Sequence, residues 1–135
     1  MKKVLCFGTF DILHKGHREF LIDAKEKGDF LIVIVIHDDA VYENKKSFPK
    51  NNQKIRALNL KKLGMADKII GTSNNKDNNI KLIKKLNPNT IVLGYDQKSK
   101  FISLLKNEFK KTKFIKSKEF AGGIHTSKLK WTLKN

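Results

Sequence analysis

Two histidines near the start of the chain, His14 and His17, are the residues best suited to do chemistry. They stand three positions apart, so they lie on one face of the first turn of a helix that begins there. A neutral imidazole, with an ordinary pKa of ~6.5, offers an N–H donor that carries no fixed charge near neutral pH. Such a donor can strengthen its hydrogen bond as charge develops on a phosphoryl oxygen. Because phosphoryl and nucleotidyl transfer require mainly positioning and charge stabilisation, the pair suits that chemistry.

The residues on either side place this pair between a strand and a helix. The apolar run in residues 3–7 predicts a strand, residues 17–27 predict a helix, and Gly8 lies in the turn between them. A helix N-terminus favours anions, because its free N–H groups and its macrodipole both present positive potential. The plainer alternative is a turn that carries two surface histidines. A zinc site would need further ligands, and the neighbouring sequence supplies no obvious set.

The segment Gly8–His17 resembles the signature of a known family. Its pattern, Gly-x-Phe-Asp-x-x-His-x-Gly-His, is similar to that of the cytidylyltransferase-like nucleotidyltransferases. That superfamily includes glycerol-3-phosphate cytidylyltransferase, archaeal-type FAD synthase and the adenylyltransferase of ADP-heptose synthesis. The resemblance runs in order and spacing from residue 3 to about residue 133. It implies a nucleoside triphosphate substrate, with Mg²⁺ to neutralise the triphosphate.

Three further segments match weaker features of the family. Gly94–Gln97 follows a buried strand at the same sheet edge as the Gly8 turn, where the family has a Gly-x-Asp segment that lines the nucleotide pocket. This version looks most like that of the archaeal-type FAD synthases. The resemblance implies that Arg56 helps to hold the triphosphate and that Lys45 and Lys46 bind phosphate. If the resemblance is set aside, Gly94–Gln97 is an ordinary turn, Arg56 is a solvated helix residue, and Lys45 and Lys46 lie in a solvated basic loop.

The segment Gly123–Leu129 resembles the family's second signature, Ile-Ser-Thr-Thr-Lys-Ile, at the start of a helix. Its hydroxyls would cap that helix, its amides would meet phosphate, and Lys128 would add a point charge. His125 stands at the serine position, and Phe120 stands where the glycerol-3-phosphate enzymes carry an arginine. The second departure favours the FAD-synthase and heptose branches. The paired cysteines that some archaeal FAD synthases carry near this motif are missing.

These motifs give the expected site. The expected catalytic residues are His14, His17 and Lys128. The expected nucleotide-binding residues are Gly8, Thr9, Phe10, Asp11, Gly16, Lys46, Arg56, Gly94, Tyr95, Asp96, Gln97, Ile124, His125, Thr126 and Ser127. Asp11 is expected to orient the turn or a histidine rather than to act as a base. No side-chain cluster is expected to bind metal, since Mg²⁺ would be carried by the triphosphate.

The composition fits one small domain with a basic surface. The 135 residues are 39% hydrophobic, and a chain of this size buries roughly two-thirds of its unfolded surface. The net charge of +16 is carried almost wholly by dispersed lysines, which argues against nucleic acid as a partner, although a basic field would steer nucleotide phosphates. No apolar run reaches the ~18 residues of a membrane span, and no cleavable leader is visible. We therefore expect a cytoplasmic protein, with Cys6 in its core.

The alternation of strands and helices predicts an α/β fold, a three-layer Rossmann-like domain with a five-stranded parallel sheet, over residues 1–135. The expected strands are residues 3–7, 30–36, 68–70, 90–93 and 113–115. The expected helices are residues 17–27, 53–63, 78–85, 101–111 and 127–133. Residues 42–52 are expected to form a loop, and Gly28 to end the first helix as a C-cap.

The expected reaction is transfer of a nucleoside monophosphate from a nucleoside triphosphate to a phosphate monoester, with release of pyrophosphate. ATP and FMN are the expected substrates. CTP with glycerol 3-phosphate is the first alternative, and a heptose or other sugar phosphate is the next. A non-catalytic nucleotide- or nucleic-acid-binding domain remains the alternative from another class. Relatives are often dimers, so a homodimer also stays open.

Overall fold

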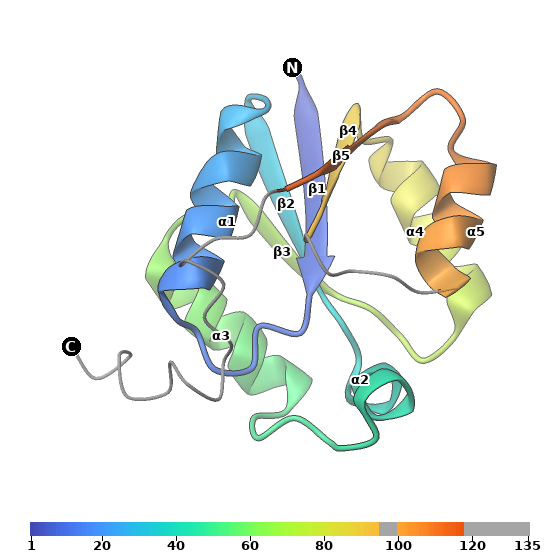
Figure 1. Ribbon diagram of the computed structural model, residues 1–135. Helices are drawn as coiled ribbons and strands as arrows, with labels where there is room; N and C mark the ends of the chain where they lie inside the picture. The colour runs from blue at the N-terminus through green and yellow to red at the C-terminus, as the bar shows by residue number, and fades with distance from the viewer. Residues whose placement is uncertain (95–99, 118–135) are drawn as a thin grey trace.

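The computed structural model describes residues 1–94 and 100–117, which form a parallel sheet with helices on both faces (Figure 1). The sheet has five strands in the order β3-β2-β1-β4-β5, and every neighbouring pair is parallel. The strands are β1 (Lys3–Gly8), β2 (Phe30–Val35), β3 (Lys68–Gly71), β4 (Thr90–Leu93) and β5 (Lys113–Lys116). The expected α/β fold with a five-stranded parallel sheet is confirmed. That residues 1–135 form one domain stays a prediction.

Four of the helices in these residues cover the two faces of the sheet. The helices are α1 (Lys15–Glu26), α2 (Asp38–Lys45), α3 (Gln53–Leu63), α4 (Lys76–Leu86) and α5 (Lys100–Glu108). In Figure 1, α1 and α3 lie on one face, α4 and α5 lie on the other, and α2 lies beyond the carboxyl ends of the strands. The expected terminal helix over residues 127–133 lies outside the described residues.

The central strand β1 shows how the core divides between these two faces. Val4 and Cys6 pack in the cluster that includes Leu21 of α1, whereas Leu5 and Phe7 pack in the cluster that includes residues of α4 and α5. This alternation is the period of two that a strand buried on both sides requires. Cys6 is completely buried, as expected, and burial raises the pKa of its thiol to about 12. It is therefore a packing residue and not a reactive thiolate.

The strand order creates one special position in the sheet. The chain fills the β1-β2-β3 side first and then crosses to β4 and β5, so the order reverses between β1 and β4. The connections that leave β1 and β4 run to opposite faces, through α1 and α5 respectively (Figure 1). Sheets of this kind bind ligands at the carboxyl ends of the strands on either side of such a reversal. Gly8 is the last residue of β1, and Gly94 directly follows β4.

Helix α2 differs from the prediction of a loop over residues 42–52. His37 caps it, since its Nδ1 atom accepts a hydrogen bond from the Asp39 backbone N–H at 3.1 Å. Asp38 and Asp39 in the first turn add favourable interaction with the helix dipole. Among the described side chains of α2, only that of Val41 is buried. The sequence of this helix therefore lacks the repeating apolar positions by which a helix is usually predicted. The other elements agree within three residues at their ends.

Gly28 is required for a different reason from the one expected. The C-cap of α1 is Lys27, in the right-handed conformation, and Gly28 does not have a positive φ. A Cβ atom on Gly28 would lie 2.7 Å from Val4 Cγ2 and 2.8 Å from the Lys2 carbonyl oxygen. The glycine therefore lets the α1–β2 connection pass against β1.

We predict that Gly28→Ala lowers the free energy of unfolding by about 1–3 kcal/mol, because the clash is partly with backbone that cannot move aside cheaply. Chemical denaturation of the variant measures the change. Glu26→Ala, at an exposed position two residues earlier at the end of α1, is the control and should shift stability by no more than about 0.5 kcal/mol. Equal stability of the Gly28 variant and the wild type would contradict the close approach.

Candidate functional site

The turn from β1 to α1 begins with a close contact between two of its residues. Phe10 has a φ of 50°, which is uncommon for a residue with a bulky side chain. This conformation lays its ring over Gly8, where an added Cβ atom would lie 3.1 Å from the ring. Phe10 is itself buried in the cluster beneath α1. Gly8 thus provides space for the ring, and the ring fixes the path of the turn toward His14.

The two histidines cap α1 through their side chains. His14 is the N-cap residue, and its Nδ1 atom accepts a hydrogen bond from the Gly16 backbone N–H at 3.1 Å. His17 Nδ1 accepts from the His14 backbone N–H at 3.3 Å, which completes a reciprocal capping box. The rings stack with centroids 3.9 Å apart, and the Phe10 ring lies 5.5 Å from that of His17. Because Nδ1 accepts in both rings, each neutral ring carries its proton on Nε2.

Both imidazoles are held in the neutral form. Burial lowers the pKa of His17 to about 3, helped by the nearby His14 and the positive charge of Lys45, while a hydrogen bond with the Ile12 backbone opposes the shift. Burial also lowers the pKa of His14. The unfolded chain would take up these protons near pH ~6.5 and the folded chain does not, so the pair costs stability as the pH falls below that value. At neutral pH the site contains uncharged donors rather than imidazolium cations.

Asp11 fastens the turn to the loop before α3. Its two carboxylate oxygens accept hydrogen bonds from the backbone N–H groups of Lys50 at 2.7 Å and Asn51 at 2.8 Å. The Asn51 side chain donates in return to the Asp11 carbonyl oxygen at 3.1 Å. Both oxygens of this carboxylate are therefore engaged by amides, as an orienting residue requires.

Arg56, expected to help hold the triphosphate, has a completely buried side chain that makes several internal bonds. Its contact with a triphosphate stays a prediction. It donates to the carbonyl oxygens of Thr9 at 2.7 Å, Ile36 at 2.8 Å and Asn51 at 2.9 Å. It also forms an ion pair with Asp38. Arg56 is thus a positioning residue that fixes the turn through Thr9, and spacing alone could not reveal its burial.

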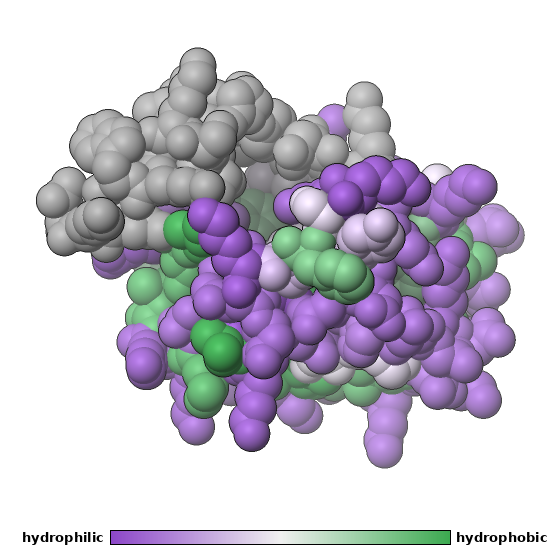
Figure 2. All heavy atoms as spheres, turned by 90° about the horizontal axis from the view of Figure 1, so that it is seen from below, coloured by the Kyte–Doolittle hydropathy of each residue, from purple (hydrophilic) through white to green (hydrophobic). Residues whose placement is uncertain are grey.

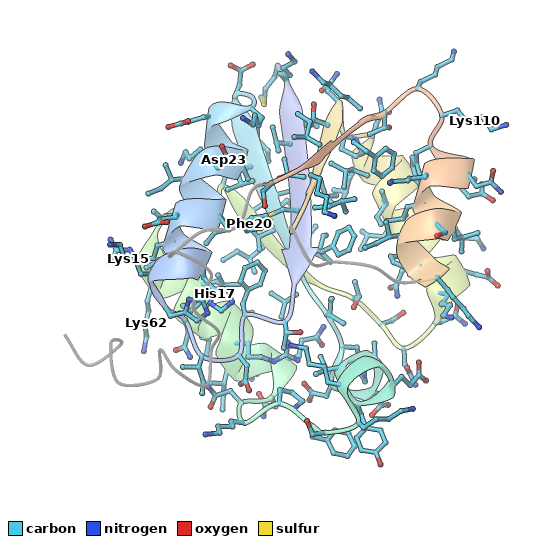
Figure 3. The ribbon with its side chains drawn as sticks, viewed as in Figure 1. Lys15, His17, Phe20, Asp23, Lys62 and Lys110 are labelled. Carbon is cyan, nitrogen blue, oxygen red and sulfur yellow. The ribbon has the colours of Figure 1, made fainter. Side chains whose placement is uncertain are left out.

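The end of α2 comes near the histidine pair. Lys45 is close enough to lower the pKa of His17, and its side chain is exposed. Lys46 is the left-handed C-cap of α2, with a φ of 61°, and it is also exposed. Figure 3 shows His17 at the first turn of α1, with Phe20 one turn further along the helix. Lys45, one of the two lysines expected to bind phosphate, thus places a positive charge near this end of α1.

The structure gathers part of the predicted site. The turn and first turn of α1 hold Gly8, Thr9, Phe10, Asp11, His14, Gly16 and His17 together. Gly94 lies at the end of the neighbouring strand β4. The following predicted residues lie outside the described residues and stay predictions: Tyr95, Asp96, Gln97, Ile124, His125, Thr126, Ser127 and Lys128. The sequence analysis missed Asn51 and the ion-pairing role of Asp38, whose one signal was its place after a buried strand.

The described residues include no group of three or more histidine, cysteine, aspartate or glutamate side chains that could hold a metal ion. None of the helices in residues 1–94 and 100–117 is long and apolar enough to cross a membrane. Figure 2 shows hydrophilic side chains over most of the coloured part of the face seen from below, with apolar side chains in small separate groups. Tyr42 and Phe48 form an exposed aromatic pair, with ring centroids 4.6 Å apart.

Comparison with curated proteins relates this chain to archaeal enzymes. An FAD synthase of Thermococcus sibiricus is 46% identical over 109 residues, which cover 81% of this chain and 72% of that protein. An FAD synthase of Thermococcus onnurineus is 42% identical over 97 residues, 71% of this chain and 63% of that protein. The chain therefore spans less than two thirds of the length of the second relative.

Comparison with solved structures agrees with this relation. A lipopolysaccharide core biosynthesis protein from Thermoplasma volcanium superposes with a TM-score of 0.76 at 30% identity, over 89% of this chain and 98% of that one. A protein of unknown function from Archaeoglobus fulgidus shares the fold, with a TM-score of 0.67 at 21% identity, over 93% of this chain and 95% of that one. The family model described as cytidylyltransferase-like matches residues 5–131. On this match, and with the capped histidine pair where the signature lies, the chain belongs to the cytidylyltransferase-like family.

Proposed function

We propose that this protein transfers the AMP group of ATP to FMN, forming FAD and pyrophosphate. The observation that carries the proposal is the pair of neutral, stacked histidines at the N-terminus of α1, beside the reversal in strand order. Identities of 42% and 46% to two archaeal FAD synthases support FMN as the acceptor. Position and charge stabilisation are the main requirements of such a transfer.

The acceptor phosphate of FMN attacks the α-phosphorus of ATP in line. A new oxygen–phosphorus bond forms at the α-phosphorus, and the bond from that phosphorus to the α–β bridging oxygen breaks, so that pyrophosphate leaves. A phosphate monoester has its second pKa at about 6, so at neutral pH it is mostly a dianion and needs no strong base. Asp11, with both oxygens bonded to backbone amides, is accordingly not assigned as one.

His14 and His17 bind the α–β region and stabilise the charge that develops on the bridging oxygen and the departing pyrophosphate. Neutral N–H donors suit this step, because their hydrogen bonds to the phosphate oxygens strengthen as negative charge develops there. The first turn of α1 contains no acidic residue, so the positive potential of its N-terminus is not cancelled there. The amides of Thr9 and Phe10 hold phosphate, and Lys45 adds a positive charge close to His17.

Mg²⁺ bound to the triphosphate would neutralise part of its charge when present. Thr126, Ser127 and Lys128 of the second signature would close on the triphosphate from the other side, and Tyr95, Asp96 and Gln97 would line the nucleoside pocket. A cytoplasmic location belongs to this proposal as an expectation, and a homodimer stays open. A sugar phosphate is the second candidate acceptor, because a lipopolysaccharide core biosynthesis protein covers 89% of this chain at 30% identity.

The substrate assignment predicts which mixture releases pyrophosphate. Purified protein with Mg²⁺ is incubated with ATP or CTP and with FMN, glycerol 3-phosphate or a heptose phosphate, and pyrophosphate is measured together with the nucleotide product. ATP with FMN should yield FAD and pyrophosphate in equal amounts. Release with another pair would overturn the acceptor, and release with no pair would favour a non-catalytic nucleotide-binding domain.

Removal of the His17 imidazole should lower kcat about 10²–10³-fold, as loss of a transition-state donor does in other enzymes. The variant His17→Ala is compared with His37→Ala, which removes a histidine that caps the different helix α2. Both variants lose a cap and should lose similar stability, about 1 kcal/mol, but the His37 variant should keep kcat within about threefold. Equal kcat losses in the two variants would refute the role of His17.

The buried position of Arg56 predicts a distinct kinetic signature. Arg56→Lys keeps a positive charge but cannot reach three carbonyl groups and a carboxylate at once. We expect a loss of about 1–3 kcal/mol in unfolding free energy and a fall in kcat with little change in KM for ATP, since the turn loosens. A raised KM with unchanged stability would instead mean that Arg56 contacts the triphosphate.

A further inference from the structure

Ser117, directly after β5, carries a buried hydroxyl group that the proposed mechanism does not use. The residue is 5% exposed. Within residues 1–94 and 100–117, its Oγ atom is the one buried side-chain oxygen or nitrogen without a hydrogen-bond partner. Folded proteins almost always pair such atoms, because an unpaired buried polar group has lost its bonds to water without replacement. The hydroxyl therefore indicates a partner outside the described part of the chain.

The sheet register shows which face of the sheet this hydroxyl lies on. Ser117 N–H donates to the Leu93 carbonyl oxygen at 2.8 Å, which extends the ladder between β4 and β5 by one residue. Cys6 pairs with Val92, and Val92 pairs with Ile115. Two residues further along each strand, the same register aligns Gly8, Gly94 and Ser117 in one row.

This row lies on the face of the sheet that α1 covers. Side chains alternate along a strand, so Ser117 lies on the same face as Val92 and Cys6 two residues earlier in the paired strands. Those two side chains pack in the cluster that contains Leu21 and Ala24 of α1. The hydroxyl is thus on the same side of the sheet as the histidine pair at the start of α1.

The distance from Gly8 to Ser117 along this row is comparable to the length of a small ligand. Neighbouring strands are about 4.8 Å apart, so Ser117 on the β5 side lies about 10 Å from Gly8 on β1. Gly94, between them, projects no side chain toward α1. At the Gly8 end, the row is occupied by the Phe10 ring, which contacts His17. A molecule with phosphates at the α1 N-terminus that extended along this row would pass Gly94 and reach Ser117.

We propose that the Ser117 hydroxyl hydrogen-bonds the nucleoside part of the substrate nucleotide and is a binding residue for it. The inference rests on the proposed function, because it takes the phosphates to lie at the histidine pair. A nucleoside is the group joined to the α-phosphate, and its ribose hydroxyls and base heteroatoms can each pair with a serine hydroxyl, which both donates and accepts. An inorganic polyphosphate has neither ribose hydroxyls nor base heteroatoms.

The test measures binding to the full chain with three probes: α,β-methylene-ATP, α,β-methylene-CTP and inorganic tripolyphosphate, each with Mg²⁺. Ser117→Ala should weaken the preferred methylene nucleotide about 5–10-fold, the loss expected for one hydrogen bond, and leave tripolyphosphate binding unchanged. The Tm of the free variant should equal or exceed that of the wild type, because no internal bond is lost. Ser117→Cys, which keeps the size but only a weak donor, should lie between them. Ser103→Ala, an exposed serine on α5, is the matched control.

Each other outcome has a definite meaning. A lower Tm or failure to fold in Ser117→Ala, with nucleotide affinity unchanged in Ser117→Cys, would show that the hydroxyl serves the fold and overturn the inference. Equal weakening of tripolyphosphate would assign the hydroxyl to phosphate and overturn it as well. If the wild type binds neither methylene nucleotide, the proposed function itself fails. If Ser117→Ala and Ser117→Cys both bind nucleotide normally, the proposed function stands and only the binding role of Ser117 is refuted.

Discussion

The buried guanidinium of Arg56 is the constraint on which the geometry of the site depends. A charge removed from water is tolerated only when its hydrogen-bond donors and its charge are matched by partners. Here the partners come from four segments, namely the turn after β1, the end of β2, the first turn of α2 and the loop before α3. None of these segments can shift without leaving a donor unpaired. The turn that leads to His14 is therefore fixed by Arg56 through the Thr9 carbonyl oxygen.

The histidine pair adds a second constraint, at the other end of the same turn. Each ring uses Nδ1 to satisfy an amide at the start of α1, so the orientation of the ring is set by the helix it caps. Burial then lowers the pKa of both rings and keeps them neutral, helped at His17 by the neighbouring His14 and Lys45. A pair of cations at the same place would bind a triphosphate more strongly in its ground state as well as in the transition state. Neutral donors instead stabilise mainly the transition state, in which negative charge develops on the bridging oxygen.

The sequence predicted those helices and strands whose bounds are set by residues close together in the chain. Gln53–Leu63 was predicted with its observed bounds, and the cap residues Asn52 and Gly64 explain why it begins and ends there. The apolar runs likewise fixed β2 and β4 to within one residue. Helix α2 was missed because it is polar on nearly every face and is held by its cap and by the contact of Asp38 with Arg56. The burial of Arg56 depends on four segments far apart in sequence, so no local pattern could show it.

The carboxylates of Asp11 and Asp38 near the candidate site are each paired with fixed donors, so they do not prevent the site from binding an anion. Asp11 lies in the signature turn, but both its oxygens are engaged by the amides of Lys50 and Asn51. Asp38 lies at the start of α2, but its charge is matched by Arg56. Their negative charge is thus taken up by fixed donors, and the helix N-terminus, Lys45 and the overall charge of +16 determine the local potential. A dispersed lysine surface is then sufficient to attract a triphosphate, because the carboxylates of Asp11 and Asp38 are already compensated within the fold.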